Sequence, residues 1–132
     1  MTSSTEPVVK REIKFRFYDK KTHKLLSECN MWWNYIEYLN GDDVIVCQFT
    51  GLLDRNGKDI YEGDIVTYTG MDKKTHNGVV EYISDRAHFG LRIKSGWSTM
   101  SSESSIRDEV IGNIYENKDL LALNKDRSNT NE

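Results

Sequence analysis

The chain has few of the residues and patterns that mark secreted or membrane proteins. Its 132 residues include two cysteines, Cys29 and Cys47, and one proline, Pro7. Two widely spaced cysteines fit a reducing compartment better than a disulfide-built scaffold. No apolar run approaches the roughly 20 residues that a membrane-spanning helix needs, and the start MTSSTEPVVK lacks the features of a signal peptide. We therefore expect a soluble cytoplasmic protein without membrane contact.

An excess of positive charge is also missing. The chain carries 18 Lys and Arg against 21 Asp and Glu, a formal net charge of −3. Tight binding to nucleic acid depends largely on Lys and Arg that neutralise phosphates, so we expect no double-stranded DNA partner. The densest basic run, formed by Lys20, Lys21, His23 and Lys24, is short enough to be a solvated turn.

The familiar motifs of enzymes and of metal or cofactor sites are absent as well. Gly51, Gly57, Gly63 and Gly70 are too far apart for a phosphate-binding loop or a dinucleotide fingerprint. No Gly-x-Ser-x-Gly elbow occurs, and the three dispersed histidines show no metal-ligand spacing with the cysteines. We expect no metal, no cofactor and no enzymatic activity.

Hydrophobic periodicity predicts strands near the start of the chain. In the segment 11–18, Ile13, Phe15 and Phe17 alternate with charged residues, which is typical of a half-buried strand. These three side chains are the predicted core face. Residues 19–23 are predicted to turn, and residues 23–28 to return as a second strand.

Later elements are predicted from β-branched runs and the turns between them. Asn40-Gly41 is a strong hairpin signal before the run 44–46, and a hairpin is predicted over 79–93. We expect a long Ser-rich loop over 95–105, a last strand over 110–115 and a short C-terminal helix capped by Asn117. About eight short strands indicate a mainly β fold, either a curled antiparallel sheet or a small barrel.

Two groups of aromatic residues are candidates for a partner surface. Residues 31–39 have helical spacing but an aromatic content that favours a strand, so a short helix is the alternative. In a strand, Trp32 and Trp33 point to opposite faces, which leaves one of them, with Tyr35, available for an interface or for the core. Trp97 lies in the predicted Ser-rich loop, either as part of a functional surface or as a lid on the core.

The run QFTGLLDRNGKDIYEGDIV, residues 48–66, combines acids with glycines at predicted turns. A calcium loop needs its glycine at the sixth position, whereas Gly57 is the fourth residue counted from Asp54, so a hairpin turn explains this part better. Glu62 and Asp64 could form a carboxylate pair for acid and base catalysis. The preferred interpretation is two turn acids that cap amides and lie in solvent.

This run, together with REIKFRFYD at 11–19 and VIGNIYEN at 110–117, closely resembles the YopX family of small proteins from bacteriophages and prophages. The resemblance covers nearly the whole of residues 11–121, although Phe49 and Leu53 replace a tyrosine and a lysine common in the family. It implies a β-rich fold and no established enzymatic activity. The matching positions indicate turns and core: Thr50, Gly51, Asp54, Gly57, Tyr61, Glu62, Gly63, Asp64, Gly112, Asn113 and Tyr115.

The expected organisation is a single YopX-like domain over residues 10–123, with disordered tails over 1–9 and 124–132. The leading functional hypothesis is a non-enzymatic phage or prophage accessory protein that binds a protein in the cytoplasm of the bacterial host cell. That partner is either a second copy, giving a homo-oligomer, or a host factor. The alternative is a module that binds a small molecule or single-stranded nucleic acid on a barrel face, with Trp97 and Tyr61 as stacking platforms.

Overall fold

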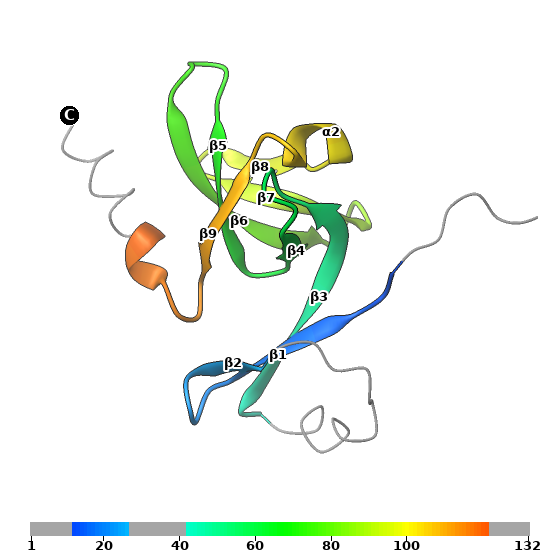
Figure 1. Cartoon of the computed structure of the whole chain (residues 1–132), viewed down its shortest axis with the longest axis vertical. Helices are drawn as coiled ribbons and strands as arrows, with labels where there is room; N and C mark the ends of the chain where they lie inside the picture. Colours follow the sequence, from blue (N-terminus) through cyan, green and yellow to red (C-terminus); the bar gives the residue numbers. More distant parts are fainter. Residues whose placement is uncertain (1–11, 27–41, 122–132) are drawn as a thin grey trace, which may run out of the picture.

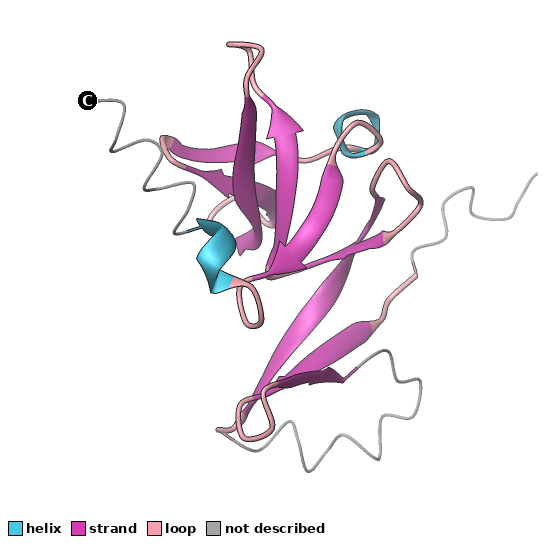
Figure 2. Ribbon diagram, turned by 60° about the vertical axis from the view of Figure 1, so that its left-hand side comes forward, coloured by secondary structure: helices cyan, strands magenta, loops and turns pink. Residues whose placement is uncertain are grey.

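The computed structural model describes residues 12–26 and 42–121, which form two antiparallel sheets (Figure 1). The first sheet has the strand order β2-β1-β3-β4, and the second has the order β8-β7-β6-β5-β9. The strands are β1 (Phe15–Asp19), β2 (Lys24–Leu26), β3 (Val44–Leu53), β4 (Asp59–Tyr61), β5 (Asp64–Thr69), β6 (Thr75–Ile83), β7 (His88–Ile93), β8 (Gly96–Thr99) and β9 (Glu109–Asn113). The predicted mainly β fold is confirmed, and the second sheet curls into a half-barrel (Figure 2).

The long strand β3 connects the two parts of the molecule. Its first half pairs with β1, from Val44 opposite Asp19 to Gln48 opposite Phe15, and its second half pairs with β4. Figure 1 shows β3 reaching from β1 and β2 toward the five-stranded sheet. The end of β3 and the short β4 therefore cover the concave side of the half-barrel.

The main core fills that concave side. It consists of Ile60, Val66, Val80, Leu91 and Val110, and Ile60 comes from β4 whereas the others come from the half-barrel. Burying an aliphatic side chain of this kind stabilises a fold by roughly 1.5–3 kcal/mol. Apolar burial therefore contributes to the contact between the two sheets.

The predicted core face of the first strand is wrong in part. Ile13 is 63% exposed and Phe15 37% exposed, whereas Phe17 is buried as predicted. The neighbouring Arg16, which alternation assigned to solvent, is buried as well, and so is Tyr18. Both faces of β1 are therefore covered around Arg16, and the polar side chain there needs a partner inside the protein.

The predicted Ser-rich loop over 95–105 is also wrong. Residues 96–99 form β8, the edge strand paired with β7, and a four-residue helix α2 (Ser102–Ser105) follows. Ser101 caps this helix: its hydroxyl oxygen accepts a hydrogen bond from the Ser104 N–H at 3.2 Å. Serines here serve as strand and cap residues, so their abundance did not indicate an irregular loop.

The C-terminal helix begins at residue 118, directly after Asn117. The Asn117 side-chain oxygen, however, accepts a hydrogen bond from the Asn113 N–H at 3.1 Å, so it closes the preceding turn. The predicted strand or helix over 31–39, with Trp32, Trp33 and Tyr35, lies outside the described residues, as does the turn at Asn40-Gly41.

Gly63, in the turn before β5, packs closely against Tyr115 in the turn 113–117. Gly63 has a φ of 85°, and a Cβ atom added there would lie 2.7 Å from Cε2 of Tyr115. Gly57 has a similar φ of 77°, but a Cβ atom there would meet nothing within 4 Å. Gly57→Ala therefore carries only the backbone penalty, about 1 kcal/mol.

We expect Gly63→Ala to lower the free energy of unfolding by at least about 2 kcal/mol, because overpacking adds to the same backbone penalty. Urea denaturation followed by circular dichroism measures both variants. Equal losses for Gly63→Ala and Gly57→Ala would contradict the close packing of Tyr115 on this turn.

Candidate functional site

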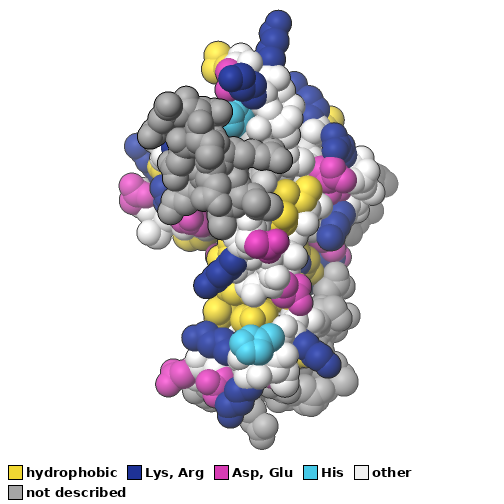
Figure 3. Space-filling model, turned by 90° about the vertical axis from the view of Figure 1, so that its left-hand side faces the viewer, with side chains coloured by type: hydrophobic (Ala, Val, Ile, Leu, Met, Phe, Trp, Pro, Cys, Tyr) yellow, Lys and Arg dark blue, Asp and Glu magenta, His cyan; other side chains and the backbone are white. Residues whose placement is uncertain are grey.

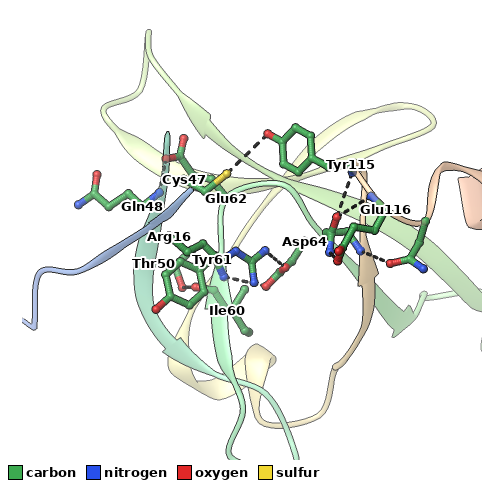
Figure 4. A network of polar contacts seen from close by, with 12 residues as sticks. Arg16, Cys47, Gln48, Thr50, Ile60, Tyr61, Glu62, Asp64, Tyr115 and Glu116 are labelled. Carbon is green, nitrogen blue, oxygen red and sulfur yellow. Dashed lines mark hydrogen bonds and ion pairs between the residues drawn. The ribbon is translucent and has the colours of Figure 1, made fainter. Parts of the chain in front are cut away.

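A buried ion pair lies where the two sheets meet. The Arg16 guanidinium of β1 contacts the Asp64 carboxylate at the start of β5 (Figure 4), and Asp64 is fully buried. The other Asp64 oxygen accepts a hydrogen bond from the Tyr61 N–H at 2.8 Å. Asp64 thus caps an amide as predicted, but the predicted solvent exposure is wrong.

Aromatic and thiol groups surround this pair. The Arg16 guanidinium carbon lies 4.5 Å from the centre of the Tyr61 ring, a cation–π distance, and Tyr61 is buried. The Cys47 thiol lies 3.7 Å from the Tyr115 hydroxyl, and Cys47 is buried as predicted. Because Tyr61 is enclosed here, the hypothesis that it is a stacking platform for a ligand is wrong.

The electrostatics of this centre follow from burial. Loss of solvent raises the pKa of the Asp64 carboxyl above its usual value, against the opposing effects of Arg16 and of the Tyr61 N–H. Burial likewise raises the pKa of the Cys47 thiol, which keeps it protonated and unreactive. The centre is a structural junction and offers no open carboxylate or thiolate to a substrate.

Asp54 fixes a second turn to the half-barrel. Its carboxylate accepts hydrogen bonds from the N–H groups of Asn56, Lys58 and Val110, at 2.8, 2.9 and 3.0 Å. Burial by itself would raise the pKa of Asp54, but these three bonds outweigh it and the pKa is lowered. The acid that suggested a calcium loop therefore joins the turn at Gly57 to β9.

Glu62, between the junction and the surface, is held by the backbone of β3. Its carboxylate oxygen Oε1 accepts a hydrogen bond from the Gln48 N–H at 2.8 Å, and its own N–H donates to the Gln48 carbonyl at 3.0 Å. Glu62 is only half buried. Its carboxylate consequently has a fixed position at the edge of an open groove.

We call this depression the Glu62 groove. It has a volume of about 610 Å³, and one wall comes from β3 and the turn before β5 while the other comes from the β6–β7 hairpin. Tyr82 and Phe89 are cross-strand partners there, with an edge-to-face ring contact at 5.3 Å, and Tyr82 is 47% exposed. The groove is lined by Gln48, Thr50, Glu62, Tyr82, Ala87, His88 and Phe89.

Trp97 lies close to this groove, on edge strand β8. Its ring contacts the His88 ring edge-on at 5.3 Å, and the Arg86 guanidinium carbon lies 5.9 Å from its centre. His88 belongs to both the groove and this contact. We call Trp97, Arg86 and His88 the Trp97 patch.

The remaining family-motif positions lie in strands β3 and β9 and in turns, and not all of them are buried. Thr50 donates a hydrogen bond from its hydroxyl to the Ile60 carbonyl at 2.7 Å, and Gly51 has a φ of 89° within β3. Asn113 accepts hydrogen bonds from the N–H groups of Tyr115 and Glu116, and Gly112 lies so close to Asn117 that a Cβ atom would clash. Of the sequence-predicted motif residues, Thr50 and Glu62 reach the groove.

Sequence reasoning missed the aromatic wall of the groove. Tyr82 and Phe89 flank the predicted turn at 84–86, and the register of that hairpin was enough to place them opposite each other. Arg16 was missed because its neighbours at 15 and 17 are apolar, so simple alternation assigned it to solvent. No local signal identifies Asp64 as its partner.

Comparisons with known proteins agree with this architecture. A model of the YopX protein family matches residues 10–122. The chain belongs to the YopX family. The crystal structure of protein EF1440 from Enterococcus faecalis is similar to this YopX-family protein, with a TM-score of 0.61 and 19% sequence identity over 85% of this chain and 99% of the other. At that identity the similarity shows the fold alone. No curated protein matches the chain.

Two further observations concern the helices and the surface charge of the described residues. No helix among the described residues is long and apolar enough to cross a membrane. On the face in Figure 3, Lys and Arg side chains are interspersed with Asp and Glu side chains among the described residues. That face does not offer a continuous basic surface to a nucleic acid backbone.

The buried ion pair between Arg16 and Asp64 should contribute strongly to the stability of the fold. Arg16→Ala leaves the Asp64 carboxylate buried without its counterion, so we expect it to lower the free energy of unfolding by about 3–5 kcal/mol. Arg92→Ala is the matched control, since Arg92 forms an exposed ion pair with Glu81 at 3.1 Å. That loss should stay below about 1 kcal/mol. Urea denaturation at neutral pH measures both, and a similarly small loss for Arg16→Ala would show that the ion pair does not support the junction.

Proposed function

We propose that this YopX-family protein is a non-enzymatic accessory protein of a bacteriophage or prophage that binds another protein in the cytoplasm of the bacterial host cell. The partner is a host factor or a second copy of the chain, and it docks in the Glu62 groove. The observation that carries the proposal is the exposed Tyr82 beside the fixed Glu62 carboxylate. Large aromatic side chains in concave sites are typical anchors of protein interfaces.

The chemistry of the groove favours binding over catalysis. Glu62 is already positioned by the Gln48 N–H, and Asp64 is buried and paired with Arg16, so the two acids do not face a common reaction centre. Tyr82 and Phe89 supply an apolar wall, while Glu62 supplies an acceptor. A partner segment with an apolar side chain next to a basic one would satisfy both walls.

The groove is tested by comparing three variants with the wild type. Tyr82→Ser removes the aromatic anchor, and Glu62→Gln removes the charge while keeping an acceptor for the Gln48 N–H. Ile106→Ser is the control, because Ile106 is exposed at the end of α2 and does not line the groove. Affinity capture from bacterial host lysate with quantitative mass spectrometry finds a host factor, and light scattering over a range of concentrations finds self-association.

We expect a complex that the wild type and Ile106→Ser retain and that Tyr82→Ser weakens by about ten-fold or more, the effect of losing an interface anchor. Glu62→Gln should weaken it less. A monomeric protein that retains no partner would overturn the proposal. So would a complex held equally well by the Tyr82→Ser variant.

A second candidate function is binding of single-stranded nucleic acid on the Trp97 patch. The supporting observation is that Arg86 and His88, two basic residues, surround the half-exposed Trp97 ring. Stacking of a base on an aromatic ring contributes roughly 1–3 kcal/mol, and nearby cations add a salt-dependent attraction.

Fluorescence anisotropy with a labelled oligothymidine tests this second function. Saturable binding that weakens with salt, falls by about ten-fold or more in Trp97→Ala and persists in Trp97→Phe is the expected result. Lys58→Ala, at an exposed turn position away from the patch, should bind as the wild type does. Binding that Trp97→Ala leaves unchanged would rule out stacking on this ring.

A further inference from the structure

A second cavity lies at the other end of the half-barrel from the Glu62 groove. Tyr68 lines it and pairs with His76 near the start of β6, whereas Tyr82 of the groove lies near the end of the same strand. The cavity has a volume of about 410 Å³ and lies between β5, β7, β8 and α2. We call it the α2 pocket.

The backbone after α2 fixes two residues of opposite charge at the wall of this pocket. The Arg107 N–H donates to the Ser104 carbonyl at 3.1 Å, and the Asp108 N–H donates to the Ser105 carbonyl at 3.0 Å. The Asp108 carbonyl in turn accepts a hydrogen bond from the Arg55 N–H at 2.9 Å. Backbone hydrogen bonds therefore hold Arg107 and Asp108 in place.

The terminal nitrogens of Arg107 and the carboxylate of Asp108 remain available to a ligand. Arg107 Nε donates to the Glu103 carbonyl at 3.4 Å, and its terminal nitrogens have no partner among the described residues. The carboxylate of Asp108 is half buried and has no hydrogen-bond donor within the described part of the chain. Burial raises the pKa of this carboxyl, against the opposing attraction of the Arg107 and Arg55 charges.

The rest of the lining combines hydroxyl groups with an apolar floor. Apart from Arg107 and Asp108, the polar lining is made of hydroxyl side chains, including those of Tyr68 and Ser104. Burial raises the pKa of Tyr68, so its hydroxyl keeps its proton and can donate as well as accept. Leu91 and Met100 supply the apolar floor.

The charges of Arg107 and Asp108 balance, so the pocket has no net attraction for an ion. A fitting ligand instead offers several donors and acceptors at once and one apolar face. We propose that the α2 pocket binds a small uncharged ring that carries neighbouring hydroxyl groups, the chemistry of a sugar. Asp108 accepts from two ligand hydroxyls, Arg107 donates to a ligand oxygen, and the C–H face of the ring lies on Leu91 and Met100.

This chemistry has two sources, a free monosaccharide and the ribose of a nucleoside. Both are tested by titrating isotope-labelled full-length protein with glucose, ribose and adenosine while two-dimensional amide NMR spectra are recorded. We expect saturable shifts of the amides of Tyr68, Met100 and Asp108 with at least one of the three. A response to glucose alone indicates a hexose, and a stronger response to adenosine than to ribose indicates a nucleoside.

Two variants and a control make the assignment to this pocket specific. Asp108→Asn and Arg107→Gln should each weaken the responding probe by about ten-fold, the effect of losing a hydrogen bond to a charged group. Asp85→Asn, on the exposed turn between β6 and β7, should leave the affinity unchanged. Arg107 is an exposed residue, so its variant keeps the test valid if Asp108→Asn fails to fold.

The absence of saturable shifts with all three probes would overturn the proposal. Saturable shifts of equal affinity in both pocket variants would overturn it too, since the ligand would then bind elsewhere. The α2 pocket shares no lining residue with the Glu62 groove. Either result would therefore leave the proposal of protein binding in that groove unaffected.

Discussion

The ion pair between Arg16 and Asp64 joins parts of the chain that are 48 residues apart, and it lies where the two sheets meet. Two opposite charges removed from water are tolerated only when each has the other and further hydrogen bonds nearby. Asp64 meets this requirement with the Tyr61 N–H, and the Arg16 guanidinium lies over the Tyr61 ring. The sheet that contains β1 is thereby held at a defined place against the half-barrel.

The turn between β4 and β5 connects this buried ion pair to the protein surface. Gly63 takes a left-handed conformation that lets Asp64 face inward, while Glu62 on its other side faces the groove and bonds to the Gln48 backbone. One short run of sequence therefore supplies an internal anchor and a surface carboxylate. Asp64 pairs with Arg16 inside the protein, and Glu62 bonds to the Gln48 backbone at the groove. Neither role requires the two acids to act as a pair.

The two ends of the half-barrel offer different chemistry because different elements close them. The β6–β7 hairpin presents aromatic rings to the Glu62 groove, whereas α2 and the residues after it present hydroxyls and two balanced charges to the α2 pocket. The two sites share no lining residue, although Leu91 of the main core also lines the α2 pocket. The two proposed ligands, a protein surface and a small polar molecule, therefore do not require the same residues.

Local features of the sequence were enough to determine much of the fold. The turns at Gly57 and Gly63, the hairpin around residues 84–86 and the last strand follow from residue types that act within a few positions of one another. The alternating pattern predicted Arg16 wrongly because it assumes that one face of the strand is exposed to solvent. The serine content predicted a loop over 95–105 wrongly because serine also caps helices. The burial of Arg16, the Glu62 groove and the α2 pocket were decided by the tertiary structure alone, since each depends on side chains from distant segments whose pairing no local pattern records.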